Sequence, residues 1–309
     1  MNYDKKKRVV LYVIIGFAVI TAVLAGLYAY KMFNSNEYEL KKKGYNEKQI
    51  NTILKLDQDK KTYIFNNEYN PDILKFYNEK YFIMDNVKKY INYKKDNKDT
   101  DYSDVVAIVN VGADEKFYTN PVKTDIEKGK LMLVNKFNYL PTDYEIEDLV
   151  TMNLQFAFND KQIKAEAYEY FKEMARAAKD EGLTILANTA YRDNEYQSLL
   201  YNNQKNRRGT EYADSVAARP GHSEHETGLA IDVSTMKSGL GGFAETPEST
   251  WMKDNAHRFG FILRYPEGKE HLTGFNYEPW HYRYVGLEDA GKINELDITF
   301  DEYYAFYIK

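Results

Sequence analysis

The sequence predicts an α+β protein in which helices flank a small, mainly antiparallel sheet, preceded by a membrane-spanning helix and a small helical module. Three observations predict this architecture: an apolar run near the N-terminus, a following stretch rich in Lys, Asn, Asp and Tyr, and a C-terminal part that alternates helix and strand patterns. A chain of 309 residues is long enough to bury a core. The predicted parts are a cytoplasmic tail (1–8), a membrane anchor (9–30), a stalk (31–104) and a globular domain (105–309).

The N-terminal segment predicts a single-pass membrane anchor. Residues 9–30 are almost all apolar, which is long enough to cross the hydrocarbon core as a helix, and residues 5–8 are basic. The rest of the chain is therefore expected outside the cytoplasmic membrane. A cleaved signal peptide ending at Val23-Leu24-Ala25 is the alternative, but the apolar run exceeds the roughly 7 to 15 residues usual for such a peptide.

Charge and cysteine content exclude several classes of protein. The net charge is −5, and because the first thirty residues carry +3, the remainder carries −8. A nucleic-acid partner is not expected, since such a protein would show a basic surface. The chain has no cysteine, which removes disulfides, thiolate metal ligands, a cysteine nucleophile and a lipoprotein anchor.

The stalk predicts short helices. Residues 39–43 and 47–56 read as two helices separated by Gly44, with Asn46 as N-cap of the second. Further apolar clusters suggest a small helical module. A spacer between membrane and domain is favoured over a cell-wall-binding module, because no aromatic platform or repeat is evident.

The globular domain is expected to begin with a strand over the β-branched run 105–111, closed by Gly112. Apolar residues at spacings of three and four predict an amphipathic helix over 160–180, which stops at Gly182. Further elements are expected in this order: a strand over 183–187, a helix over 194–204, a loop over 213–221, a strand over 229–233, a helix capped by Thr246 and ending at Gly260, strands over 261–265 and 277–285, and a short helix behind the capping box Thr299-x-x-Glu302.

Two separated motifs carry the chemistry: Ser223-x-His225-x-x-Gly228-x-Ala230-x-Asp232 and Glu278-x-Trp280-His281. His225 and Asp232 are too far apart for one helical face, so a loop and the strand after it are expected to hold them, with His281 on a neighbouring strand. Two imidazoles and one carboxylate suit a zinc ion that keeps a fourth position for water. One zinc ion per chain is predicted. His222, His257 and His271 fit no ligand spacing.

Glu278 is the candidate general base of such a site. Positions i and i+3 of a regular strand face opposite sides, so Glu278 and His281 can converge only if Pro279 bends the segment. The alternative for Glu278 is a hydrogen-bond acceptor that orients His281.

The two motifs together resemble the zinc D-alanyl-D-alanine carboxypeptidases of the VanY type, within the lysostaphin, D-Ala-D-Ala peptidase and hedgehog superfamily. The resemblance implies a metallopeptidase that removes the terminal D-alanine from peptidoglycan stem peptides. It implies that Arg192 stabilises the oxyanion, because Tyr191-Arg192 matches the family's Tyr-Arg turn, although Asp193 departs from it. By resemblance alone, Tyr191, Gln197 and Ser223 are candidate substrate-binding residues.

Several alternatives stay open at this point. Relatives with the same metal motif act as L,D-carboxypeptidases on tetrapeptide stems or as peptidoglycan endopeptidases. A non-catalytic, zinc-containing cell-wall-binding module is the rival of another class, although the presence of Glu278 and Arg192 argues against it. No Ser-x-x-Lys motif accompanied by its Ser-Asp-Asn and Lys-Thr-Gly partners is present, so a serine-type enzyme is not expected.

Overall fold

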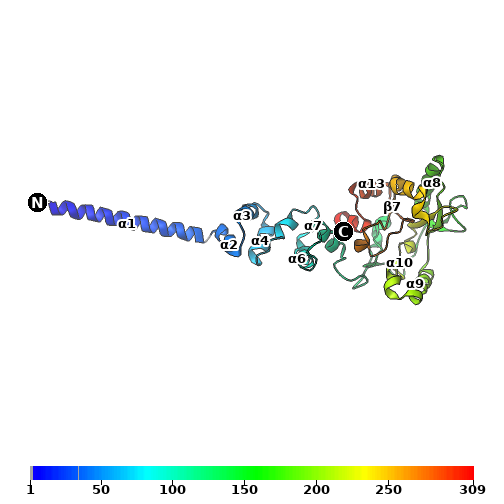
Figure 1. The fold of residues 1–309 in the computed structure, drawn as a ribbon, viewed down its shortest axis with the longest axis horizontal. Coiled ribbons are helices and arrows are strands. Elements are labelled where there is room, and N and C mark those ends of the chain that lie inside the picture. The colour runs from blue at the N-terminus through cyan, green and yellow to red at the C-terminus, as the bar shows by residue number, and fades with distance from the viewer. Residues whose placement is uncertain (1–2, 34) are drawn as a thin grey trace. The chain divides into compact units, whose positions relative to one another are not determined.

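The computed structural model describes residues 3–33 and 35–309, and its contacts divide the chain into two units, one ending at Val87 and one running from Lys88 to Lys309 (Figure 1). Residues 1 and 2 of the predicted tail lie outside the described residues. The helices of the first unit are α1 (Tyr3–Phe33), α2 (Asn36–Lys43), α3 (Glu47–Ile53), α4 (Gln58–Asn66), α5 (Ile73–Tyr77) and the 3-10 turn η1 (Met84–Asn86).

Helix α1 contains a stretch, Leu11–Phe33, that is long and apolar enough to span a membrane. None of its most apolar window is buried inside the protein. A helix near the N-terminus with these properties fits the predicted anchor in length and composition.

The stalk helices follow their capping signals. Asn46 caps α3 and forms a capping box with Gln49, as two backbone-to-side-chain bonds of 3.0 Å show. Gly44 ends α2 in the left-handed conformation, at φ 115°, which glycine adopts without strain. Leu40, Ile50 and Ile53 are buried within this unit, and the two short helices predicted on either side of Gly44 are confirmed as α2 and α3.

The second unit contains one four-stranded sheet and two pairs of short strands. The sheet order is β5 (Leu186–Thr189), β6 (Ala230–Ser234), β8 (His281–Tyr284) and β7 (Phe261–Leu263), and every neighbouring pair is antiparallel. The short pairs are β1 (Val122–Lys123) with β2 (Asn138–Tyr139), and β3 (Leu149–Thr151) with β4 (Gln162–Lys164). The predicted α+β class with a mainly antiparallel sheet is therefore confirmed.

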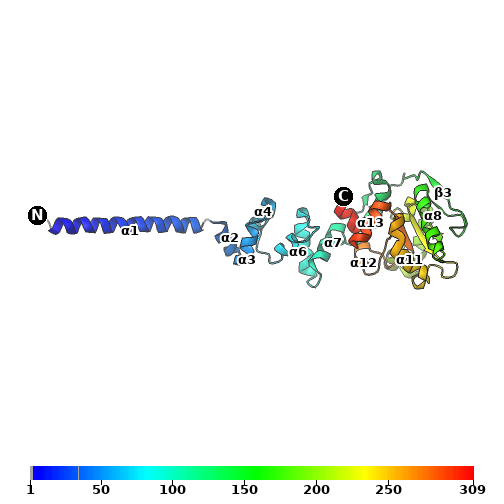
Figure 2. The ribbon, with the colours of Figure 1, turned by 90° about the horizontal axis from the view of Figure 1, so that it is seen from above.

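Helices make up much of the second unit, and α8 and α11 lie near each other where Figure 2 labels them. The helices are α6 (Val87–Asp96), α7 (Tyr102–Val111), α8 (Ala165–Asp180), α9 (Asn194–Arg208), α10 (Thr210–Val216), α11 (Pro247–Asn255), α12 (Glu270–Thr273), α13 (Leu287–Leu296) and α14 (Phe300–Tyr303). Shorter turns are η2 (Ile126–Leu131), η3 (Glu224–Thr227), η4 (Phe243–Glu245), η5 (Ala256–Phe259) and the π-helical η6 (Tyr304–Ile308).

The strand predicted over residues 105–111 is wrong, because this segment belongs to helix α7. Asp101 precedes the helix, and Gly112 ends it in the left-handed conformation at φ 86°. Residues 105–110 are all buried, and Ala107 and Ile108 pack against Leu272. A short apolar run looks the same in a buried helix and a buried strand, so packing overrides its β-branched composition. With α6 and α7 in the second unit, that unit begins earlier than the expected boundary at residue 105.

Several other boundaries differ from the prediction; strands β5 and β8, for example, begin at Leu186 and His281 instead of residues 183 and 277. The amphipathic helix begins at Ala165 instead of Asp160, because Ile163 pairs with Val150 in the β3–β4 hairpin. The loop predicted over 213–221 begins inside α10, which follows Gly209. The predicted caps at Thr246 and Thr299 are confirmed at the starts of α11 and α14.

The two faces of the sheet differ in chemistry. On one face, Ile231, Val233 and Tyr282 join the main hydrophobic core, to which α8 contributes Phe171 and Met174. Side chains alternate along a strand, so the intervening residues point to the opposite face. Asp232 lies directly opposite His281 in the β6–β8 register, which brings two of the predicted metal ligands together.

Candidate metal centre

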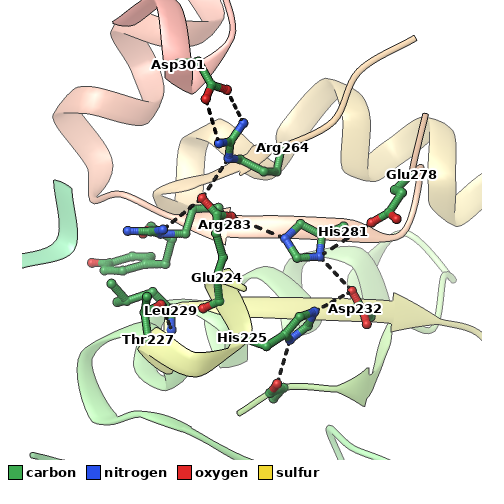
Figure 3. Close-up of polar contacts among 12 residues, drawn as sticks. Glu224, His225, Thr227, Leu229, Asp232, Arg264, Glu278, His281, Arg283 and Asp301 are labelled. Carbon is green, nitrogen blue, oxygen red and sulfur yellow. Dashed lines mark hydrogen bonds and ion pairs between the residues drawn. The ribbon is translucent and has the colours of Figure 1, made fainter. Parts of the chain in front are cut away.

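His225, Asp232 and His281 form one buried cluster, with one donor atom from each within 4.8 Å of the others. We call these three residues the ligand cluster (Figure 3). Asp232 Oδ1 lies 3.2 Å from His225 Nε2 and 2.9 Å from His281 Nδ1. Each of the three residues is at most 4% exposed. The sequence prediction that these residues converge is therefore confirmed.

Local structure orients the His225 ring toward Asp232. It lies in η3, which Gly228 ends in the left-handed conformation at φ 68°. The Nδ1 atom of His225 lies 2.7 Å from the carbonyl oxygen of Ala190, so Nδ1–H donates there and Nε2 is left to face Asp232. A cation held by Nε2 would meet an imidazole whose orientation and tautomer are already set.

The segment before β8 bends as the Glu278 hypothesis requires. The strand begins only at His281, and the amide of His281 donates to the carbonyl of Glu278 at 3.1 Å, which closes a turn through Pro279. Glu278 Oε2 consequently lies 3.9 Å from His281 Nδ1. The carboxylate therefore stands beside the ligand cluster instead of facing away from it (Figure 3).

The electrostatics of the centre follow from burial and close charges. Burial, followed by the charge of Arg192, lowers the pKa of His225 to about 4, so this imidazole is neutral at pH 7. Burial would raise the pKa of Asp232, but the neighbouring histidines and Arg192 hold it well below its usual range. Burial opposes protonation of His281, but its bonds to Asp232 and Glu224 raise its pKa to about 9. A cation bound at Nδ1 would displace that proton.

Glu278 differs from Asp232 in its protonation. Burial, with a further contribution from the charge of Asp232, raises the pKa of Glu278 to about 7, against the opposing charge of His281. A carboxyl group with a pKa near neutrality can both accept and return a proton. A cation in the ligand cluster would lower this value.

Arg192 follows β5 and lies against the ligand cluster. Its Nη2 donates to Asp232 Oδ2 at 2.9 Å, and its Nη1 donates to Gln197 Oε1 at 3.3 Å. Gln197 in turn donates to the carbonyl of Ala218 at 2.8 Å. Nε of Arg192 is buried and has no hydrogen-bond partner among the described residues. The guanidinium therefore holds Asp232 in place through Nη2. The contact of Nη1 with Gln197 is longer, so a substrate atom can replace it more readily.

A pocket of about 280 Å³ opens over the ligand cluster. Predicted residues that line it are Arg192, Gln197, Ser223, Glu278 and the ligand cluster itself. Other lining residues are mostly apolar: Leu200, Val216, Ala217, Ala218, Leu240, Phe275 and Trp280, together with Gln204, Glu224 and Tyr265. We call this space the metal pocket.

Tyr191 lies outside the lining of the metal pocket. It lines a neighbouring pocket of about 360 Å³ together with Tyr139, Tyr144 and His222. Arg192 belongs to both pockets, which makes it the link between them.

Sequence reasoning missed a group of charged side chains behind His281. Glu224 Oε2 lies 3.4 Å from His281 Nε2, and its other oxygen accepts from Arg264 Nε at 2.7 Å and Arg283 Nη1 at 3.0 Å. Arg264 Nη1 then donates to Asp301 at 2.6 Å. We call Glu224, Arg264, Arg283 and Asp301 the buried ionic network. A usable signal was present, since an arginine inside an otherwise apolar strand requires a buried partner.

The part of the chain that holds this site is similar to known proteins. A family model described as VanY, D-alanyl-D-alanine carboxypeptidase, matches residues 160–287. YodJ of Bacillus subtilis (strain 168), which carries the provisional name carboxypeptidase, is 41% identical over 181 residues, covering 56% of this chain and 66% of YodJ. The chain thus spans slightly less than two thirds of that relative.

The matches to two solved structures cover a larger share of the matched chain. The LD-carboxypeptidase LdcB, whose structure is said to reveal the molecular basis of peptidoglycan recognition, is 39% identical with a TM-score of 0.57, covering 60% of this chain and 90% of LdcB. A vancomycin-resistance D,D-pentapeptidase VanY from a VanB-type cassette, in complex with Zn(II), is 32% identical with a TM-score of 0.51, covering 56% of this chain and 98% of that one.

A buried His-Asp-His donor set beside a carboxylate, inside a pocket, is the arrangement typical of a catalytic zinc site. The sequence and structure matches identify the protein family. The chain belongs to the VanY D-alanyl-D-alanine carboxypeptidase family.

Proposed function

We propose that this protein is a membrane-anchored zinc carboxypeptidase that removes the terminal D-alanine from peptidoglycan stem peptides. The observation that carries the proposal is the convergence of three metal-ligand side chains and a separate carboxylate in one pocket. A purely structural zinc site needs no adjacent base, so this arrangement favours an enzyme over a binding module.

The ligand cluster fits zinc by its donor chemistry. His225 Nε2, Asp232 Oδ1 and His281 Nδ1 are two nitrogen atoms and one oxygen atom, which is a catalytic zinc set that leaves a position open. When bound, the ion acts as a Lewis acid on the peptide carbonyl and activates water. The position of Glu278 beside His281 Nδ1 puts its carboxylate next to where the reacting groups would lie.

Glu278 moves the proton in this mechanism. Its carboxylate takes a proton from the attacking water and returns it to the nitrogen of the departing D-alanine, so the residue ends each cycle as it began. Burial raises the pKa of Glu278 to about 7 before metal binding, and the cation would lower it, so the carboxylate would be ionised and able to accept the proton of water.

Arg192 and the pocket wall bind the substrate. Arg192 Nη1 turns from Gln197 to the carbonyl oxygen that gains negative charge, while Nη2 stays on Asp232. Ser223 and Gln197 stand at the pocket surface as candidate partners for the terminal carboxylate. The small side chains of Ala217 and Ala218 leave room for an alanine methyl group.

The N-terminal segment places the enzyme at the cell membrane. Leu11–Phe33 would span the bilayer once, with residues 5–8 on the cytoplasmic side and the catalytic unit outside the membrane. The stalk helices would then act as a spacer that brings the metal pocket to the peptidoglycan.

The direct test measures zinc content and D-alanine release from synthetic stem peptides by the full chain in detergent micelles. Chelator-sensitive release from the pentapeptide, restored by added zinc, is expected. Release from the tetrapeptide alone would move the assignment to an L,D-carboxypeptidase, an activity named for the similar protein LdcB. Bound zinc without release from either peptide would contradict the carboxypeptidase function.

The protein is expected to be insensitive to β-lactam antibiotics. Ser234 and Lys237 have the spacing of a Ser-x-x-Lys motif, but Ser234 is fully buried at the end of β6 and Lys237 is exposed. Ser234 therefore cannot act as the acylated nucleophile of a serine-type enzyme. Incubation with a fluorescent penicillin should leave the protein unlabelled, with a serine-type penicillin-binding protein as positive control. Covalent labelling would contradict the zinc mechanism.

A further inference from the structure

The ring of His281 is held at both of its nitrogen atoms. Nδ1 faces Asp232 and belongs to the ligand cluster, whereas Nε2 faces Glu224 Oε2 at 3.4 Å on the opposite edge of the ring. His281 and Glu224 are both buried, so solvent does not compete for this contact. Once a metal ion takes Nδ1, the proton on Nε2 needs an acceptor, and Glu224 is the one beside it.

Glu224 is itself fixed by two arginines. Its Oε1 accepts from Arg264 Nε and Arg283 Nη1, which leaves Oε2 directed at His281 (Figure 3). The side chains of Glu224, Arg264 and Arg283 have no exposed surface. The orientation of the carboxylate therefore depends on where the two guanidinium groups lie.

The two arginines are anchored differently. Arg283 donates to the backbone carbonyls of Lys130, Met132 and Tyr284, so the main chain holds it. Arg264 instead donates through both terminal nitrogens to one side chain, Asp301, at 2.6 Å and 3.3 Å. Asp301 is the point at which the network can be weakened without touching the ligand cluster.

Asp301 comes from the C-terminal end of the chain. It lies in α14, a short helix that begins with the capping box of Thr299 and Glu302. Asn135 Nδ2 donates to Asp301 Oδ1 at 2.8 Å and fixes the carboxylate from the other side. Helix α14, which carries neither metal motif, is thus connected to His281 through Arg264 and Glu224.

We propose that Glu224 and Asp301 are positioning residues of the zinc site, through which the C-terminal helix α14 sets the orientation of His281 by the contacts Asp301–Arg264–Glu224. Two carboxylates balance two guanidiniums in this network, so it remains neutral when zinc enters beside it. The inference rests on the proposed zinc site. If Asp301 had a purely structural role, only the folding stability would depend on it. As a positioning residue, Asp301 must also affect the affinity for zinc.

The test compares zinc dissociation constants of full-length variants, measured by competition with a chromogenic chelator. Glu224→Gln is expected to weaken zinc binding about 10- to 100-fold, as for other groups that hold a metal-ligating histidine. Asp301→Asn is expected to weaken it in the same direction. Because Asp301 acts through Glu224, adding Asp301→Asn to Glu224→Gln should cause no further loss.

The matched control is Glu302→Gln, on the same helix. Glu302 is also buried, and it accepts from Thr299 without contacting the network. This variant should lower the melting temperature of the zinc-free protein yet leave zinc affinity unchanged. Melting of each zinc-free variant identifies any that fails to fold, and if Glu224→Gln fails, the comparison of Asp301→Asn with Glu302→Gln decides.

Unchanged zinc affinity in folded Asp301→Asn would overturn the inference, as would an equal loss in Glu302→Gln. A wild-type protein that binds no zinc would instead refute the proposed function itself. The two failures are therefore distinguishable.

Discussion

Glu278→Gln is expected to lower D-alanine release about 10²- to 10⁴-fold, the usual contribution of a positioned acid or base, while zinc stays bound. The amide keeps the size of the carboxylate but cannot accept a proton from water. The ligand cluster is left intact, because Glu278 lies 3.9 Å from His281 Nδ1 and is not one of its three members. Peptide turnover and zinc content, measured on the same preparation, check this result.

The control for Glu278→Gln is Glu267→Gln, an exposed glutamate in the turn after β7, which should change neither quantity. Two results would count against the general-base assignment. Turnover near the wild-type level would exclude it, and loss of zinc together with turnover would favour the alternative in which Glu278 mainly orients His281.

The ligand cluster was predictable from sequence because its spacing is local and its chemistry is narrow. His225 and Asp232 lie seven positions apart in the sequence, which suits a turn followed by a strand, and two imidazoles with a carboxylate suit few ions. The requirement that Pro279 bend the chain was also predictable, since strand geometry alone would separate Glu278 from His281. Helix starts at Asn46, Thr246 and Thr299 were likewise predictable, because a cap acts within one turn.

The sequence predictions failed where tertiary contacts determine the secondary structure or the side-chain pairing. The run 105–111 has strand-like composition, but burial on all sides allows β-branched residues in a helix. The contact of Asp301 with Arg264 joins residues whose pairing no local pattern specifies. The sequence indicates that Arg264 needs a buried partner, but which residue supplies it becomes clear only when the segment after β7 and helix α14 are placed together.

His225→Ala and His281→Ala are each expected to lose zinc and activity together. Three protein side chains provide the donors, so removing one leaves two, which is fewer than a catalytic zinc site commonly uses. Zinc content after dialysis, followed by D-alanine release with excess zinc, measures both effects.

His271→Ala is the matched control, since His271 is exposed in α12 and lies outside the ligand cluster, and it should retain zinc and turnover. If His281→Ala kept its zinc, the metal would have to be held by other donors and the cluster would be wrong. If zinc were lost but turnover persisted, the metal would be structural and Glu278 would have no role as its base. Joint loss in both histidine variants, set against retained zinc in Glu278→Gln, separates the groups that hold the ion from the group that moves the proton.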